Sequence, residues 1–167
     1  MAHPMPERIE TERLILRPWA AIDDVWHRVI VTERDRPPED PASYSTKVVI
    51  EQRHRTQTQG FGLYVIEARA ESDPIGYRGL VVGRATLAEP ELAYELLRRA
   101  QGNGYATEAS RAVVEAAADA GLVRLWATVG AWNTPSLRVL DKLGFTRERV
   151  EHLDDRAIIW ARLDLSR

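Results

Sequence analysis

The stretch Gln101-Gly102-Asn103-Gly104-Tyr105-Ala106-Thr107-Glu108-Ala109 follows an alternating run from Pro90 to Leu97 and opens an alanine-rich helix. Glycine at positions 102 and 104 permits backbone angles that other residues rarely adopt, and it lets a ligand approach the main chain. The first N–H groups of a helix have no partner within the helix, and the helix dipole adds partial positive charge there. The stretch therefore predicts a binding site for a phosphate-bearing ligand at the start of this helix.

The spacing within this stretch distinguishes between kinds of phosphate loop. The dinucleotide fingerprint needs a third glycine where this chain has Thr107, and the nucleotide P-loop needs Gly-Lys where it has Gly104-Tyr105. The pattern that fits is Gln/Arg-x-x-Gly-x-Gly/Ala, which is met by Gln101, Gly104 and Ala106. It resembles the acyl-CoA pyrophosphate loop of the GNAT superfamily of N-acyltransferases.

Two further segments carry the same resemblance. Asn133-Thr-Pro-Ser-Leu-Arg-Val-Leu-Asp-Lys-Leu-Gly-Phe145 is similar to the Asn-x-x-Ser…Leu-Gly-Phe signature of this family. Glu10-Thr-Glu-Arg-Leu-Ile-Leu-Arg-Pro18 is similar to the opening strand of the branch that includes the ribosomal-protein alanine N-acetyltransferases. The resemblance is strong over residues 75–145, good over 10–18 and nearly absent over 20–60.

The resemblance implies where acetyl-CoA, the acyl donor, is bound. In the family, two neighbouring strands splay apart and the pantetheine arm enters the gap; here these strands are 91–97 and 123–129. The implied acetyl-CoA-binding residues are Tyr94, Glu95, Leu96, Gln101, Gly102, Asn103, Gly104, Tyr105, Ala106, Thr107 and Asn133. Asn133 has a second interpretation as the N-cap of the helix that follows it.

Acyl transfer from a thioester needs a neutral amine, a stabilised oxyanion and a proton for the leaving thiolate. In the family a backbone N–H in the gap stabilises the oxyanion, and the matching amide here is near Leu96. Glu91 and Glu95 alternate along one strand, so both carboxylates are expected on one face, and Glu91 is the first candidate for the base. The alternative is a solvated face without a catalytic role.

The residue expected as the general acid differs between this chain and many members of the wider superfamily. Many members have a tyrosine seven residues after the asparagine, and this chain has Leu140 there. Ser136 is then the candidate proton donor, and its alternative interpretation is a first-turn helix residue that bonds its own backbone. Tyr94 and Thr128 are lesser candidates for proton transfer.

The acceptor determines how much base catalysis is needed. A protein N-terminus has a pKa of about 8, so deprotonation at pH 7 costs roughly 1 kcal/mol, whereas a lysine at about 10.4 costs roughly 4 to 5 kcal/mol. A terminal amine therefore needs little general-base catalysis.

Composition is typical of one compact enzyme domain. The 167 residues, 44% of them hydrophobic, predict a single domain over residues 1–167, which the resemblance implies is an N-acetyltransferase domain. The formal net charge of −2 gives no electrostatic reason to expect nucleic acid or an anionic membrane as a partner. The chain has no cysteine, which excludes disulfides and a cysteinyl acyl-enzyme.

The sequence also leads to expectations about the cellular location, metal content and oligomeric state of the protein. No stretch has the length of a membrane span or the apolar core of a signal peptide, so a cytoplasmic protein is expected. His27 and His54 have no convincing metal-ligand neighbours in sequence, so no metal is expected. The opening strand is a candidate edge for a homodimer.

Periodicity and resemblance together predict an α/β (α+β) fold, with a mostly antiparallel, centrally splayed mixed sheet of about seven strands and helices on both faces. The expected helices span 22–32, 41–59, 106–120 and 134–142, and the expected strands span 14–17, 61–68, 75–85, 91–97, 123–129, 145–150 and 157–163.

The expected function is direct, acetyl-CoA-dependent acetyl transfer to a primary amine, with a protein or peptide N-terminus as the first choice of acceptor. One alternative is a small-molecule amine such as an antibiotic or a polyamine. Another is a non-catalytic acyl-CoA-binding regulatory protein, an interpretation that the absence of the family's proton-donating tyrosine supports.

Overall fold

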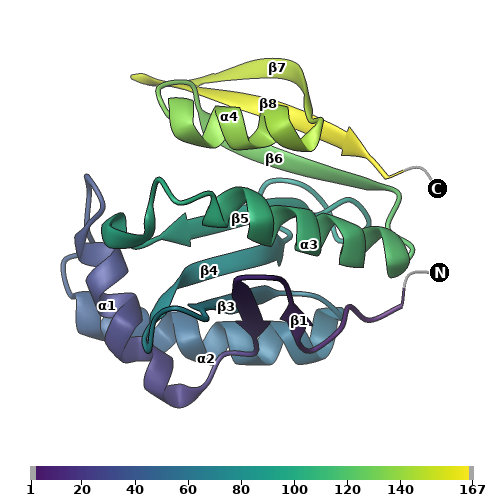
Figure 1. The fold of residues 1–167 in the computed structure, drawn as a ribbon. Helices are drawn as coiled ribbons and strands as arrows, with labels where there is room; N and C mark the ends of the chain where they lie inside the picture. Colours follow the sequence, from purple (N-terminus) through teal and green to yellow (C-terminus); the bar gives the residue numbers. More distant parts are fainter. Residues whose placement is uncertain (1–2, 166–167) are drawn as a thin grey trace.

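A computed structural model describes residues 3–165 as an eight-stranded sheet with helices on both faces (Figure 1). The strand order is β1-β2-β3-β4-β5-β6-β8-β7. The strands are β1 (Ile9–Glu10), β2 (Leu14–Arg17), β3 (Leu63–Ala68), β4 (Pro74–Val81), β5 (Glu91–Leu96), β6 (Arg124–Gly130), β7 (Thr146–Leu153) and β8 (Arg156–Asp164). The helices are α1 (Asp24–Thr32), α2 (Pro41–Gln59), α3 (Tyr105–Asp119) and α4 (Thr134–Leu143), with short 3₁₀ turns η1 (Ala21–Asp23) and η2 (Arg98–Ala100).

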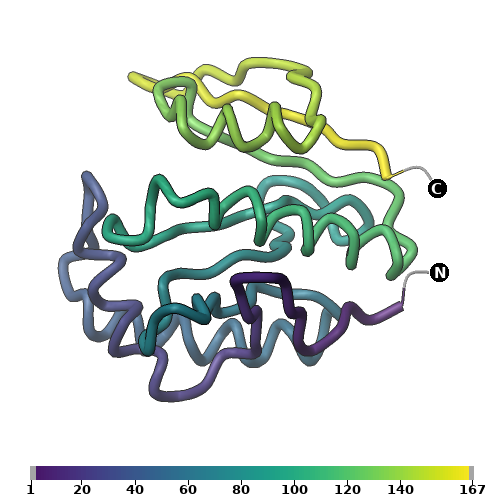
Figure 2. Tube along the Cα trace, viewed as in Figure 1, coloured from purple at the N-terminus to yellow at the C-terminus, as the bar shows by residue number. Residues whose placement is uncertain are grey.

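The layers follow from alternation along the strands. In β3, Leu63 and Val65 pack with the side chains of α1 and α2, whereas Tyr64 and Ile66 belong to the core below α3 and α4. All four side chains are buried because each face of the sheet is covered by helices. The Cα trace shows α1 and α2 on one side of the sheet and α3 and α4 on the other (Figure 2).

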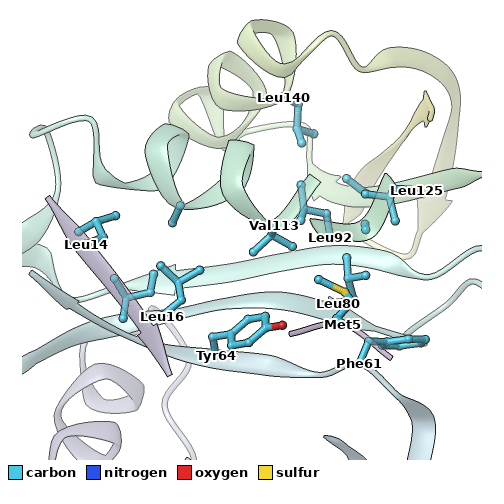
Figure 3. Close-up of a cluster of buried hydrophobic side chains, with 14 of the residues drawn as sticks. Met5, Leu14, Leu16, Phe61, Tyr64, Leu80, Leu92, Val113, Leu125 and Leu140 are labelled. Carbon is cyan, nitrogen blue, oxygen red and sulfur yellow. The ribbon is translucent and has the colours of Figure 1, made fainter. Parts of the chain in front are cut away.

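The core below α3 and α4 brings together residues from distant parts of the sequence (Figure 3). Val113 from α3 and Leu140 from α4 point towards strand residues such as Leu16 and Leu92. Alanines at 109 and 117 lie on the same face of α3 as Val113 and are fully buried, so the helix packs close to the strands.

The sequence predicted several element ends correctly. Helix α2 spans Pro41–Gln59 as expected, because Asp40 caps its first turn and Gly60 adopts the left-handed conformation after its end (φ 76°). Several other element ends differ from the prediction by one to three residues, as in β7, which continues to Leu153, and the main differences are in β4 and β1. The chain leaves β4 at Val81 to turn through Gly83 (φ 54°), so that strand is shorter than expected, and β1 adds a strand of only two residues, too short to show a period.

The centre of the sheet is splayed, as predicted. Strands β5 and β6 are parallel and are in register only at Glu91 and Trp126, where the Trp126 N–H also donates to the Pro90 carbonyl (2.9 Å). By contrast, β5 pairs with β4 along its whole length, from Glu91 to Leu96. The two central strands therefore diverge towards the end of β5, where α3 begins.

No helix within residues 3–165 is both long and apolar enough to cross a membrane.

Candidate functional site

The gap beside β5 exposes a backbone donor. The Leu97 N–H donates to the Ile75 carbonyl in β4 (2.8 Å). Because N–H groups along a strand point alternately to its two edges, the Leu96 N–H points away from β4 and into the gap. The amide that the family resemblance implies as the oxyanion donor thus faces the splayed region.

The loop after β5 is shaped by its two glycines. Gly102 and Gly104 have φ values of 80° and 79°, which residues with a side chain rarely adopt. The first bond within α3 is donated by Glu108 to the Gly104 carbonyl (3.1 Å), so the N–H groups of residues 105–107 have no partner within the helix. The loop therefore presents amides at a helix N-terminus, as the sequence predicts.

The turn between β1 and β2 fixes this loop in place. The Arg13 guanidinium donates to the Asn103 carbonyl (2.8 Å) and to the Glu108 carboxylate (2.6 Å), and it lies 4.7 Å from the centre of the Tyr105 ring. On the other side, the Gln101 amide donates to the Leu96 carbonyl (3.1 Å). Gln101 thus ties the loop to the end of β5.

A cavity of about 480 Å³ lies between the end of β5, this loop and α4. It is lined by Tyr94, Glu95, Leu96, Ala100, Gln101, Gly102, Gly104, Tyr105, Ala106, Thr107, Asn133, Pro135, Ser136, Arg138, Val139 and Lys142. The predicted acetyl-CoA-binding residues thus come together there, except that Asn103 does not line the cavity.

Two cationic residues of the cavity were not foreseen from the sequence. Arg138 and Lys142 are one helical turn apart on α4, so their side chains fall on the same side of the helix. That spacing is visible in the sequence, and both residues lie within the segment that resembles the family. A larger groove of about 1360 Å³ runs along α3 beside the N-terminal segment and shares Gly104, Thr107 and Lys142 with the cavity.

Ser136, the candidate proton donor, makes two contacts. The Ser136 N–H donates to the Asn133 side chain (3.3 Å), so Asn133 does cap α4. The Ser136 hydroxyl lies 2.6 Å from the Tyr94 hydroxyl, across the gap from β5. No local pattern in the sequence pairs Ser136 with Tyr94, because the two residues are 42 positions apart.

The two carboxylates of β5 do share a face, but they have different surroundings. Glu91 is buried, and its carboxylate accepts the Arg84 N–H (2.6 Å) and the Thr128 hydroxyl (2.9 Å). Glu91 does not line the cavity, so these bonds give it a structural role, and its assignment as the base stays a prediction.

Glu95 lines the cavity, and its carboxylate is hydrogen-bonded on the face of the sheet that α1 and α2 cover. Both of its oxygens accept from Arg34 (2.7 Å each), and one also accepts from the Tyr77 hydroxyl (3.0 Å). The bond with Glu95 raises the pKa of Arg34, and burial raises the pKa of Tyr77. The segment after α1 is thereby fastened to β5 on the face covered by α1 and α2.

A buried histidine lies beside this ion pair. His27 shares a hydrogen bond with Ser45 (2.9 Å) and is surrounded by the rings of Trp19, Trp26, Tyr44 and Tyr77 at 5.6 to 6.2 Å. Burial, and then the charge of Arg34, lower the pKa of His27 to about 4. Among residues 3–165, no group of three or more His, Asp or Glu side chains is arranged to hold a metal ion.

Comparison with known proteins gives a family and a set of related folds. Residues 13–146 match the family described as Acetyltransferase (GNAT) domain. None of the curated proteins matches the sequence significantly.

Three solved structures illustrate the shared fold. An acetyltransferase from Agrobacterium tumefaciens str. C58 has 24% identity and a TM-score of 0.79, over 98% of this chain and 96% of its own. Ribosomal-protein-S5-alanine acetyltransferase from Vibrio fischeri has 18% identity and a TM-score of 0.78, over 94% and 96%. Microcin C7 self-immunity acetyltransferase MccE, in complex with acetyl-CoA and AMP, has 17% identity and a TM-score of 0.80, over 96% and 98%.

Proposed function

This chain belongs to the GNAT family of acetyltransferases and is an acetyl-CoA-dependent N-acyltransferase, and we propose that its acceptor is the terminal amine of a protein or peptide. One observation carries the proposal about the site. A single cavity brings together the end of β5 with its free Leu96 N–H, the glycine loop and the Ser136 hydroxyl.

In the proposed complex, the amides of residues 105–107 bind the pyrophosphate of acetyl-CoA. They combine unpaired donors with the positive end of the α3 dipole, which favours an anion. Arg138 and Lys142 add positive charge from α4, on the opposite wall of the cavity. The pantetheine arm then runs between β5 and α4, beside Asn133.

The Leu96 N–H would stabilise the negative charge that develops on the thioester oxygen. A backbone donor fixed in a strand needs no reorganisation during the reaction, which is the main advantage of such groups in catalysis. Because the donor is main chain, side-chain substitution at Leu96 cannot remove it.

The surroundings of the gap favour an amine that loses its proton readily. Glu91 is about five residues along β5 from Leu96, which is roughly 16 Å in a strand and too far for a single bridging water. Glu95 is closer, but Arg34 and Tyr77 occupy its oxygens. A terminal amine, at a cost of roughly 1 kcal/mol, needs no stronger base than water near these groups.

The relative from Vibrio fischeri, named for acetylation of an alanine in a ribosomal protein, supports a terminal amine as the acceptor class. The MccE structure, which contains AMP, shows that enzymes of this fold also bind small molecules, so the acceptor needs a direct test.

The test is thiol release from acetyl-CoA with two matched peptides of the same internal sequence. One peptide has a free N-terminus and no lysine, and the other has a blocked N-terminus and one lysine. Release only with the first peptide, together with a mass gain of one acetyl group, is the expected result. Release only with the lysine peptide, or only with small amines in a parallel panel, would overturn the proposed acceptor.

A further inference from the structure

Arg78 is the most unusual side chain in the core. It lies on β4, it is completely buried, and none of its three guanidinium nitrogens has a hydrogen-bond partner among residues 3–165. Arginine is rarely buried without a paired anion, because removing a charge from water is costly. Burial lowers the pKa of Arg78 to about 9, so the side chain is still a cation at neutral pH.

The immediate neighbours of Arg78 are aromatic. Its cross-strand partners are Tyr64 on β3 and Tyr94 on β5, and its guanidinium carbon lies 4.4 Å from the centre of the Tyr94 ring. The carboxylates of Glu91 and Glu95 are on the opposite face of β5, so they do not neutralise it. The charge of Arg78 is therefore directed at the π-face of Tyr94.

Tyr94 connects this charge to the proposed site. Its ring packs against Arg78 and its hydroxyl lies 2.6 Å from the Ser136 hydroxyl, and both Tyr94 and Ser136 line the acetyl-CoA cavity. A row of three side chains thus runs from the core below α3 to the cavity wall. At the tyrosine position usual in the family, on α4, this chain has Leu140, so the row supplies a phenol from β5 instead.

We propose that Arg78 is a positioning residue that holds the Tyr94 ring against Ser136 and stabilises the negative charge that develops on the Tyr94 oxygen as this pair passes a proton to the leaving thiol. The inference rests on the proposed acetyl transfer, and it adds Arg78 and Tyr94 to the groups that serve it.

The proton balance is simple. As the C–S bond breaks, its electron pair stays on sulfur, and the Ser136 hydroxyl donates a proton to that sulfur. Tyr94 donates its proton to the Ser136 oxygen and becomes a phenolate, which Arg78 stabilises. The amine loses a proton to water on forming the C–N bond, and water returns one proton to Tyr94, so the residues end as they began.

A buried charge retained for function has a testable consequence. Replacing Arg78 by methionine, which has similar length and no charge, removes the cost of burial, so this variant is expected to be at least as stable as the wild type. The same change is expected to lower kcat by roughly tenfold to a hundredfold, with an unchanged KM for acetyl-CoA. A rise in thermal stability with a fall in kcat is a pattern that a purely structural residue would not produce.

Three further variants complete the experiment. Arg78→Lys keeps the charge and is expected to recover part of the lost kcat. Tyr94→Phe removes the phenol and is expected to lower kcat by about a hundredfold. Arg149→Met removes a similar contact, 4.1 Å from the Trp160 ring and away from the cavity, and is expected to leave kcat unchanged.

The outcomes separate this inference from the function on which it rests. If wild-type protein transfers acetyl groups while Arg78→Met and Tyr94→Phe both keep wild-type kcat, the proton path is wrong and the transferase assignment stands. If Arg78→Met does not fold, Arg78 is a structural residue and its proposed role is refuted, while Tyr94→Phe still tests the phenol. If the wild type itself transfers no acetyl group, the proposed function fails first.

Discussion

His27 predicts a specific loss of stability in acid. The side chain is almost completely buried, with 1% of its surface exposed, and its Nδ1 atom lies 2.9 Å from the Ser45 hydroxyl. Burial and the nearby Arg34 charge lower its pKa from 6.5 to about 4, against a weaker opposing effect of Glu95. The native protein therefore resists protonation at a pH where the unfolded chain accepts a proton.

The sign and size follow from this difference in pKa. Between pH 6.5 and 4 the unfolded state binds more protons at this position, so the free energy of unfolding falls as the pH falls. Above pH 6.5 the histidine is neutral in both states and contributes no pH dependence. One pKa unit corresponds to about 1.4 kcal/mol, so the shift corresponds to roughly 2 to 3 kcal/mol by pH 4 after allowance for relaxation and screening.

The assay is urea unfolding of the wild type and of His27→Asn at pH 7.0, 5.5 and 4.5. Asparagine places a polar atom close to the Nδ1 position but does not titrate, so carboxylates that titrate in both proteins cancel in the difference. The variant is expected to be less stable at pH 7.0, and the gap is expected to narrow by about 2 kcal/mol as the pH falls. Parallel curves over this range would refute the reasoning.

Three further substitutions test the surroundings of the cavity. Arg34→Met leaves the Glu95 carboxylate with Tyr77 as its only partner, so it is expected to lower the free energy of unfolding in urea by about 1 to 3 kcal/mol and to change the KM for the acceptor. The control Arg36→Met removes an exposed ion pair with Asp155 and is expected to change neither quantity. Because Glu91 lies outside the cavity, Glu91→Gln is expected to keep kcat within about threefold, and a fall of a hundredfold or more in steady-state assays would identify Glu91 as the base. Lys142→Met is expected to weaken acetyl-CoA binding by about tenfold in calorimetry, and an equal loss in Lys47→Met, the only other lysine, would show that the effect is unspecific.

Much of the fold could be predicted from local signals. The N-cap, the N-terminal proline and the final glycine of α2 are encoded within a few residues of its ends, and the structure places both ends where the sequence indicated. The glycine loop was also predictable, because the two positive φ values need residues without a side chain. Strand β1 has two residues and no period, so no local pattern marked it.

The site was only partly predictable because its contacts join distant residues. Alternation placed Glu91 and Glu95 on one face, but it could not show that Arg34, 61 positions away, would bind Glu95. The contact between Tyr94 and Ser136 depends on how α4 packs across the gap. A lone arginine in a strand is normally expected on the surface, so nothing in the sequence marked Arg78 as buried.

The most direct test of acetyl-CoA binding at the glycine loop is calorimetric titration of acetyl-CoA into the wild type and into Gly104→Glu, followed by thiol release with a peptide that has a free N-terminus. A side chain at Gly104 would place its Cβ 3.4 Å from Arg13 and add negative charge beside the helix N-terminus. The expected result is binding and peptide-dependent release by the wild type, with neither in a folded Gly104→Glu variant. Unchanged acetyl-CoA affinity in that folded variant would contradict the proposed binding site.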